Sequence, residues 1–137
     1  MDRPGPACEA RPVSASSVKV LAVDDQRGFL DVIRAVVEAT SGFRWAGGAT
    51  SGADALTEAD LNHPDLVLID VEMPEMNGVE VARRLLTRYP GMLVALISAH
   101  RPDELPKAAA ESGVGAILPK ENLSPAWLRG FWQEHHS

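Results

Sequence analysis

The 137 residues, of which 45% are hydrophobic and 23% charged, are enough for one globular domain with a substantial core. The 19 acidic and 13 basic residues give a net charge of −6, which disfavours nucleic acid and anionic membranes as direct partners because both select basic surfaces. The sequence has no apolar stretch near the ~20 residues of a membrane span, no secretory signal at its start and a single cysteine, Cys8, so we expect a cytoplasmic protein.

The chain begins with a segment whose composition differs from the rest. Residues 1–17 are rich in Pro, Ser, Ala and Gly, and we expect a disordered leader there, ahead of a folded domain at 18–137. Beyond the leader, short apolar runs alternate with stretches of helical periodicity. The apolar runs predict strands at 18–24, 43–47, 66–69, 93–97 and 114–118. The periodic stretches predict helices at 27–40, 52–61, 79–89, 105–111 and from 124 to the end.

Local signals mark two of these helices. The helix at 27–40 places its apolar side chains at helical spacing, which predicts a face buried against the sheet by Phe29, Ile33, Val36 and Val37. Ser51 directly precedes the helix at 52–61, and its side chain is suited to cap the first backbone N–H groups.

Five alternating strands and helices with short connections predict a parallel sheet covered by helices on both faces. The Rossmann-like strand order expects a glycine-rich turn after the first strand. Here that turn is Asp24-Asp25-Gln26, whose carboxylates would repel the phosphates of a dinucleotide. We therefore predict a flavodoxin-like (βα)5 three-layer sandwich of order 2-1-3-4-5, which brings Asp25 next to Asp70.

Polar residues follow the apolar runs at the positions where strands end. In a sheet of this type Asp24, Asp25, Asp70, Ser98 and Lys120 should converge at one edge. Carboxylates placed together repel each other, and a hard divalent cation with oxygen ligands, Mg²⁺, resolves the repulsion. Asp70 is then free to attack phosphorus and form an aspartyl phosphate, with a lysine charge and a serine hydroxyl at hand.

The motifs VDD, ID-x-x-MP-x-x-NG, IS-A and the lysine after the fifth strand resemble those of the receiver domain of two-component response regulators. The resemblance runs from Val18 to the end of the chain. It implies a phosphoryl group taken from a histidine kinase or phosphotransfer protein, or from a small donor such as acetyl phosphate. It also implies that the domain catalyses only its own phosphorylation and dephosphorylation, so that it is not an enzyme acting on other substrates.

The same resemblance assigns a role to each acidic residue. Asp70 is the phospho-acceptor, and it holds Mg²⁺ together with Asp24, Asp25 and the backbone carbonyl of Glu72. Glu72 and His100 occupy positions that flank the approach of water to the phosphoryl group. We expect Glu72 to slow hydrolysis by shielding and electrostatic repulsion, and the alternative is that both side chains point to solvent.

Ser98 and Lys120 are implied to contact the phosphoryl group and start the switch. Many receivers carry Tyr or Phe three residues before this lysine, and its ring turns inward on activation. Here the position is Ile117, so the signal must pass through backbone shifts after the fourth and fifth strands or through repacking of Ile117.

We expect output through the face built by the helix at 105–111, the strand at 114–118 and the last helix. The last helix carries Trp127, Leu128, Phe131 and Trp132, which are too many large side chains for one buried face of a helix. We therefore expect one exposed ring, suited to an output protein or a phosphorylation-dependent homodimer.

We expect a stand-alone receiver of the chemotaxis type, without a DNA-binding output. The alternatives are a fragment of a longer regulator, a phosphorylation-independent binding module on the same fold, and a phosphatase of the haloacid dehalogenase type.

Overall fold

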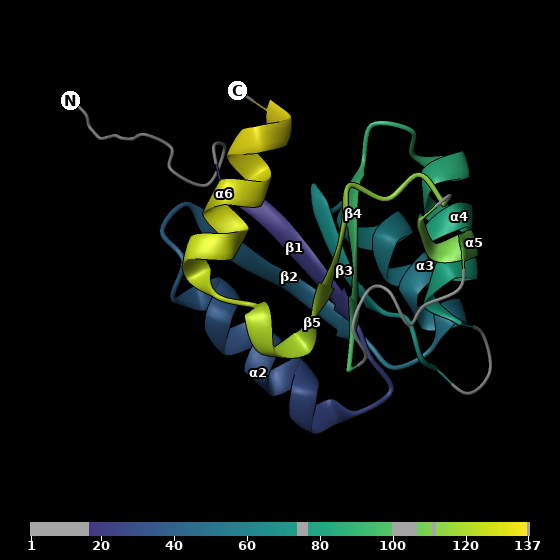
Figure 1. Ribbon diagram of the computed structural model, residues 1–137, viewed down its shortest axis with the longest axis horizontal. Helices are drawn as coiled ribbons and strands as arrows, with labels where there is room; N and C mark the ends of the chain where they lie inside the picture. The colour runs from purple at the N-terminus through teal and green to yellow at the C-terminus, as the bar shows by residue number, and fades with distance from the viewer. Residues whose placement is uncertain (1–16, 74–76, 100–106, 111, 137) are drawn as a thin grey trace.

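The computed structural model describes residues 17–73, 77–99, 107–110 and 112–136. One parallel five-stranded sheet of order β2-β1-β3-β4-β5 forms the centre of the domain (Figure 1). This order confirms the predicted flavodoxin-like topology. Of the leader expected at 1–17, residues 1–16 lie outside the described residues. The strands are β1 (Val18–Val23), β2 (Phe43–Ala49), β3 (Leu66–Asp70), β4 (Leu93–Ser98) and β5 (Ala116–Pro119).

Helices cover both faces of the sheet, which gives the expected three layers. They are α2 (Arg27–Glu38), α3 (Gly52–Asn62), α4 (Gly78–Arg88), α5 (Lys107–Ala110) and α6 (Pro125–His136). Figure 1 shows α2 and α6 on one side of the strands and α3, α4 and α5 on the other. Among the described helices, none is long and apolar enough to cross a membrane.

The two helical layers share the central strands through alternating side chains. In β3, Val67 and Ile69 belong to the core cluster under α3 and α4, whereas Leu66 and Leu68 belong to the cluster under α2 and α6. Successive side chains of a strand point to opposite faces, so a strand buried on both faces needs a continuous apolar run. The apolar runs therefore predict the central strands well, because the side chains of each run are buried in the cores on both faces of the sheet.

Element boundaries shift by one or two residues from those predicted. Ser51 caps α3 as expected, since its hydroxyl oxygen accepts a hydrogen bond from the Asp54 N–H at 3.1 Å. β2 runs to Ala49 rather than to residue 47, and the pairing register shifts opposite Val20 and Leu21 of β1. The helix predicted at 105–111 is described only at 107–110, and residues 105, 106 and 111 lie outside the described part.

The segment around β5 differs most from the prediction. The strand begins at Ala116 instead of residue 114 and ends at Pro119. A short 3₁₀ turn, η3 (Lys120–Asn122), connects it to α6 and was not predicted. Figure 1 shows this turn at the lower end of β5, next to the beginning of α2.

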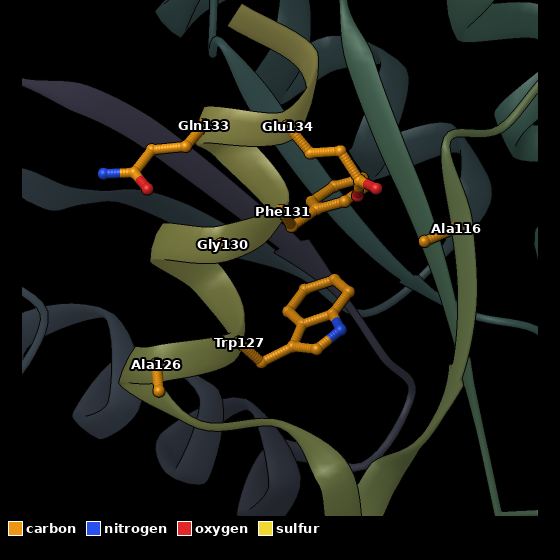
Figure 2. Close-up of a pocket in the computed structure, with 7 residues that line it drawn as sticks. All are labelled: Ala116, Ala126, Trp127, Gly130, Phe131, Gln133 and Glu134. Atoms are coloured by element: carbon orange, nitrogen blue, oxygen red, sulfur yellow. The ribbon is translucent and has the colours of Figure 1, made fainter. Parts of the chain in front are cut away.

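The aromatic side chains of α6 are more buried than expected. Phe131 is buried, and Trp127 and Trp132 are each partly buried against the core cluster of α2 and α6. The prediction that one ring is exposed is therefore wrong. Trp127 stacks on Phe131, with ring centroids 4.7 Å apart, and this contact covers part of each ring. The pair lines a groove between α6 and β5 (Figure 2).

The end of β3 and the beginning of α4 pack directly against each other. The Asn77 side chain caps α4 by accepting from the Glu80 N–H at 2.9 Å, and the Gly78 N–H donates to the Val71 carbonyl at 2.9 Å. A Cβ at Gly78 would overlap the carbonyl oxygen of Asp70 and lie 2.9 Å from the Val71 Cα. Only glycine allows this close approach of two backbones.

We predict that Gly78→Ala lowers the free energy of unfolding by about 1–3 kcal/mol, because the added methyl group must push α4 away from the end of β3. Urea denaturation monitored by circular dichroism measures the change. Gly28→Ala is the matched control, since Gly28 also lies in the first turn of a helix but a Cβ there meets nothing within 4 Å. Equal effects of the two substitutions would contradict the packing argument.

Candidate functional site

The carboxyl ends of β1, β3, β4 and β5 lie side by side because these strands are sheet neighbours in that order. Asp24 follows β1, Asp70 ends β3, Ser98 ends β4 and Lys120 follows β5. Carboxylate oxygens of Asp24, Asp25 and Asp70 all lie within 4.8 Å of one another. The strand topology therefore produces the predicted convergence.

Asp24 is a fully buried carboxylate that shapes the turn into α2. Its Oδ1 accepts a hydrogen bond from the Gln26 N–H at 2.8 Å. Its Oδ2 is buried and accepts no hydrogen bond among the described residues, although the Lys120 ammonium lies 3.0 Å away as an ion-pair partner. A buried carboxylate oxygen with unused lone pairs is costly, which marks this atom as a candidate ligand position.

Lys120 is the cation of the site and serves two carboxylates at once. Its Nζ lies 3.0 Å from Asp24 Oδ2 and 3.6 Å from Asp70 Oδ2, and its side chain is only 19% exposed. One ammonium cannot balance two buried carboxylates and the neighbouring exposed Asp25. The site therefore keeps a negative excess that favours a further cation.

The Asp70 carboxyl group has an altered pKa. Burial raises this pKa from 3.8 to about 6, and the negative charges of Asp24 and Glu72 add to the rise. A hydrogen bond from the Glu72 N–H to Asp70 Oδ1, 3.1 Å long, and the charge of Lys120 act in the opposite direction. A strongly perturbed carboxyl at a cluster of charges is a candidate functional group.

The donor set fits a hard divalent cation. Three carboxylates contribute oxygen atoms only, and their spacing is compatible with one shared ion. One of them, Asp24, has a buried oxygen that accepts no hydrogen bond within the described part of the chain. Oxygen ligands with an incomplete protein shell suit Mg²⁺, which keeps water and phosphate oxygens among its ligands. The residues present therefore meet the requirements of the predicted magnesium site.

The four remaining predicted residues differ in where they lie. Ser98 is fully buried at the end of β4, whereas the Glu72 side chain is exposed just after Asp70. Ile117 pairs with Leu96 of β4 and packs against the core of the α3 and α4 layer. His100 lies outside the described residues.

Sequence reasoning missed one residue that contacts the site. The Phe29 ring, expected only in the buried face of α2, lies with its centroid 4.4 Å from Lys120 Nζ. The available signal was an aromatic residue four positions after the acidic pair, in the first turn of the following helix. That signal does not predict that the ring contacts Lys120, which lies far away in the sequence.

Comparison with known proteins agrees with this arrangement. The response regulator receiver domain family matches residues 20–128. The signal receiver domain of NarL from Mycobacterium tuberculosis superposes with a TM-score of 0.78 at 26% identity, covering 88% of this chain and 97% of that one. The fold and the acidic site thus define a receiver, and the chain belongs to the response regulator receiver domain family.

Two curated relatives are longer than this chain. The transcriptional regulatory protein DegU of Brevibacillus brevis is 27% identical over 109 residues, which are 80% of this chain and 46% of that protein. The protein-glutamate methylesterase/protein-glutamine glutaminase of Pyrococcus horikoshii is 30% identical over 115 residues, 82% of this chain and 31% of that protein. The chain therefore spans about half or less of these relatives.

We predict that Asp70→Asn stabilises the metal-free protein at neutral pH but not at pH 4. The folded-state pKa of about 6 lies above the ordinary 3.8, so the wild type loses stability as pH rises between these values. The loss is at most ~3 kcal/mol, and the favourable charge of Lys120 is already included in the pKa of about 6.

Urea denaturation in EDTA at a series of pH values measures this difference. Asp31→Asn, which removes one exposed carboxylate from α2, controls for the change in net charge. An Asp70→Asn advantage of equal size at pH 4 and pH 7 would contradict the electrostatic account.

Proposed function

We propose that Asp70 accepts a phosphoryl group from a histidine kinase or phosphotransfer protein in a magnesium-dependent reaction. An Asp70 oxygen attacks phosphorus while the P–N bond to the donor imidazole breaks, and the electron pair leaves with the imidazole. The observation that carries this proposal is the buried Asp70 carboxylate beside Asp24 and the Lys120 ammonium. With acetyl phosphate as donor, the P–O bond to acetate breaks instead.

The acidic residues and the lysine divide the work of phosphoryl transfer. Asp24, Asp25, Asp70 and the backbone carbonyl of Glu72 would hold Mg²⁺, which supplies positive charge to the phosphoryl oxygens when bound. Lys120 supplies a second positive charge from a position that already borders Asp70. Positioning and charge neutralisation are the main contributions a protein makes to this reaction.

The switch begins, in this proposal, at Ser98 and Lys120. Ser98 ends β4, the strand next to β3, and Lys120 follows β5, the strand beyond β4. A phosphoryl group on Asp70 would draw the Ser98 hydroxyl and the Lys120 ammonium toward its oxygens, and the segments after β4 and β5 would move with them. Ile117 of β5 pairs with Leu96 of β4, so a shift of the segment after β5 would also reach β4 through this pairing. Contacts that favour one of two states shift the population between them.

The output face is formed by α5, β5 and α6, and we propose a protein as its partner. A groove runs between β5 and α6, with the rings of Trp127 and Phe131 on one side and Ala116 on the other (Figure 2). Aromatic side chains in a groove are typical anchors for protein contacts. The proposed partner is an output protein or a second phosphorylated copy of the domain, and the interaction takes place in the cytoplasm. We do not expect direct binding of nucleic acid or membrane, because the chain has a net charge of −6.

Incubation with Mg²⁺ and acetyl phosphate should add one phosphoryl group to the wild type, as measured by intact-protein mass spectrometry. The adduct should be absent from Asp70→Asn and absent from the wild type in EDTA. Asp31→Asn is the matched control and should be phosphorylated normally. An adduct on Asp70→Asn would contradict the assignment of the acceptor. A wild type that takes no phosphoryl group and binds no beryllofluoride in Mg²⁺ would favour a phosphorylation-independent binding module.

We predict that Glu72→Ala speeds the loss of the phosphoryl group roughly fivefold, because a carboxylate near the phosphoryl oxygens repels an incoming water polarised as a nucleophile. The decay of the phosphorylated form, followed by mass spectrometry after removal of the donor, measures the rate. Glu72→Gln separates charge from shielding, since it keeps the size of the side chain and removes its charge. An unchanged or slower loss in Glu72→Ala would refute the role proposed for Glu72.

A further inference from the structure

The aromatic ring of Phe29 borders the ammonium group of the site. Its centroid lies 4.4 Å from Lys120 Nζ, within the ~6 Å at which a ring face attracts a cation. Phe29 is partly buried against the core cluster of α2 and α6, which holds the ring in place. The contact therefore joins the first turn of α2 to the turn that follows β5.

The backbone of the same turn ties Phe29 to the acidic cluster. The Gln26 N–H donates to Asp24 Oδ1 at 2.8 Å, and the Phe29 N–H donates to the Gln26 carbonyl at 3.1 Å. One short segment thus places both a buried carboxylate and an aromatic ring next to the Lys120 ammonium. This arrangement places the lysine by contacts from α2 as well as by ion pairs.

Lys120 and a metal ion compete for the same carboxylate. Among the residues that the structure describes, the nearest anion to the ammonium is Asp24 Oδ2 at 3.0 Å, and this buried oxygen accepts no hydrogen bond from any of them and is suited to bind Mg²⁺. A cation on that oxygen weakens the ion pair, and a long lysine side chain then gains conformational freedom. The ring face does not bind Mg²⁺ and keeps its attraction for the ammonium.

We infer that Phe29 is a positioning residue that keeps the Lys120 ammonium beside Asp70 when Mg²⁺ occupies the carboxylates. This inference rests on the proposed function, because it assigns Phe29 a role in phosphoryl binding through Lys120. A ring attracts the cation without neutralising it, so the full positive charge stays available to the phosphoryl oxygens. A carboxylate in the same place would consume that charge.

Phe29→Leu removes the ring and keeps an apolar side chain, and Phe29→Tyr keeps the ring. In the presence of saturating Mg²⁺, titration calorimetry with beryllofluoride should show roughly fivefold to tenfold weaker binding for Phe29→Leu and near wild-type binding for Phe29→Tyr. The affinity for Mg²⁺ alone should stay the same in both. General damage to the α2 turn would instead weaken Mg²⁺ binding as well, because Asp24 depends on that turn.

A double-mutant cycle tests whether the effect passes through the lysine. In a Lys120→Gln background, Phe29→Leu should cause no further loss of beryllofluoride affinity. Phe43→Leu is the matched control, since Phe43 packs against the same core cluster but begins β2 at the opposite end of the sheet. If Phe29→Leu does not fold, Phe29→Met provides a second variant without a ring.

The outcomes separate this inference from the proposed function. Wild-type beryllofluoride binding together with unchanged affinity in Phe29→Leu or Phe29→Met overturns the role of Phe29 and leaves the phosphorylation proposal intact. An equal loss in Lys120→Gln and wild-type backgrounds also overturns it, because the ring then acts independently of the lysine. A wild type that binds neither beryllofluoride nor a phosphoryl group overturns both proposals.

Discussion

The candidate site depends on two carboxylates that are buried at one edge of the sheet and share the ammonium group of Lys120. Asp24 and Asp70 lie at the ends of neighbouring strands, and Lys120 reaches both of them. Burying like charges together is unfavourable unless other charges and hydrogen bonds compensate them. The backbone N–H groups of Gln26 and Glu72 and the Lys120 ammonium provide that compensation in part. The part that remains uncompensated is what makes the site receptive to a cation.

The topology of the sheet is the reason why residues so distant in the chain can share this site. β1 and β3 are direct neighbours, as are β3 and β4 and then β4 and β5, so their carboxyl ends line up along one edge. Helices then adjust the details: α2 brings Phe29 over the lysine, and the glycine at the start of α4 allows that helix to approach the Asp70 backbone. The site is therefore built by the ends of elements, and the cores beneath them keep those ends in place.

Much of this arrangement could be predicted from the sequence because the signals are local. Apolar runs such as the one at Leu66–Asp70 predict strands, and the acidic turn after the first strand excludes a dinucleotide site and selects the strand order. Convergence of Asp24, Asp25 and Asp70 then follows from topology alone.

Other features depend on tertiary packing and could not be predicted. The ring of Phe29 faces Lys120 only because α2 and η3 meet in space, and the late start of β5 at Ala116 reflects its pairing with β4. The aromatic residues of α6 misled the prediction because helical spacing alone does not show that two rings stack in a groove beside β5. The Phe29–Lys120 contact and the β4–β5 pairing join residues that are far apart in the sequence, and the groove of α6 exists only because β5 lies beside that helix.

A crystal structure of the protein with Mg²⁺ and beryllofluoride would show whether Asp70 and Lys120 act together on a phosphoryl group. We predict the beryllium on an Asp70 oxygen, the metal ion on Asp24 and Asp25, and the Lys120 ammonium turned from Asp24 toward a fluorine atom. A structure with beryllofluoride on another residue, or with Lys120 still paired to Asp24 and the fluorine atoms facing solvent, would contradict this prediction.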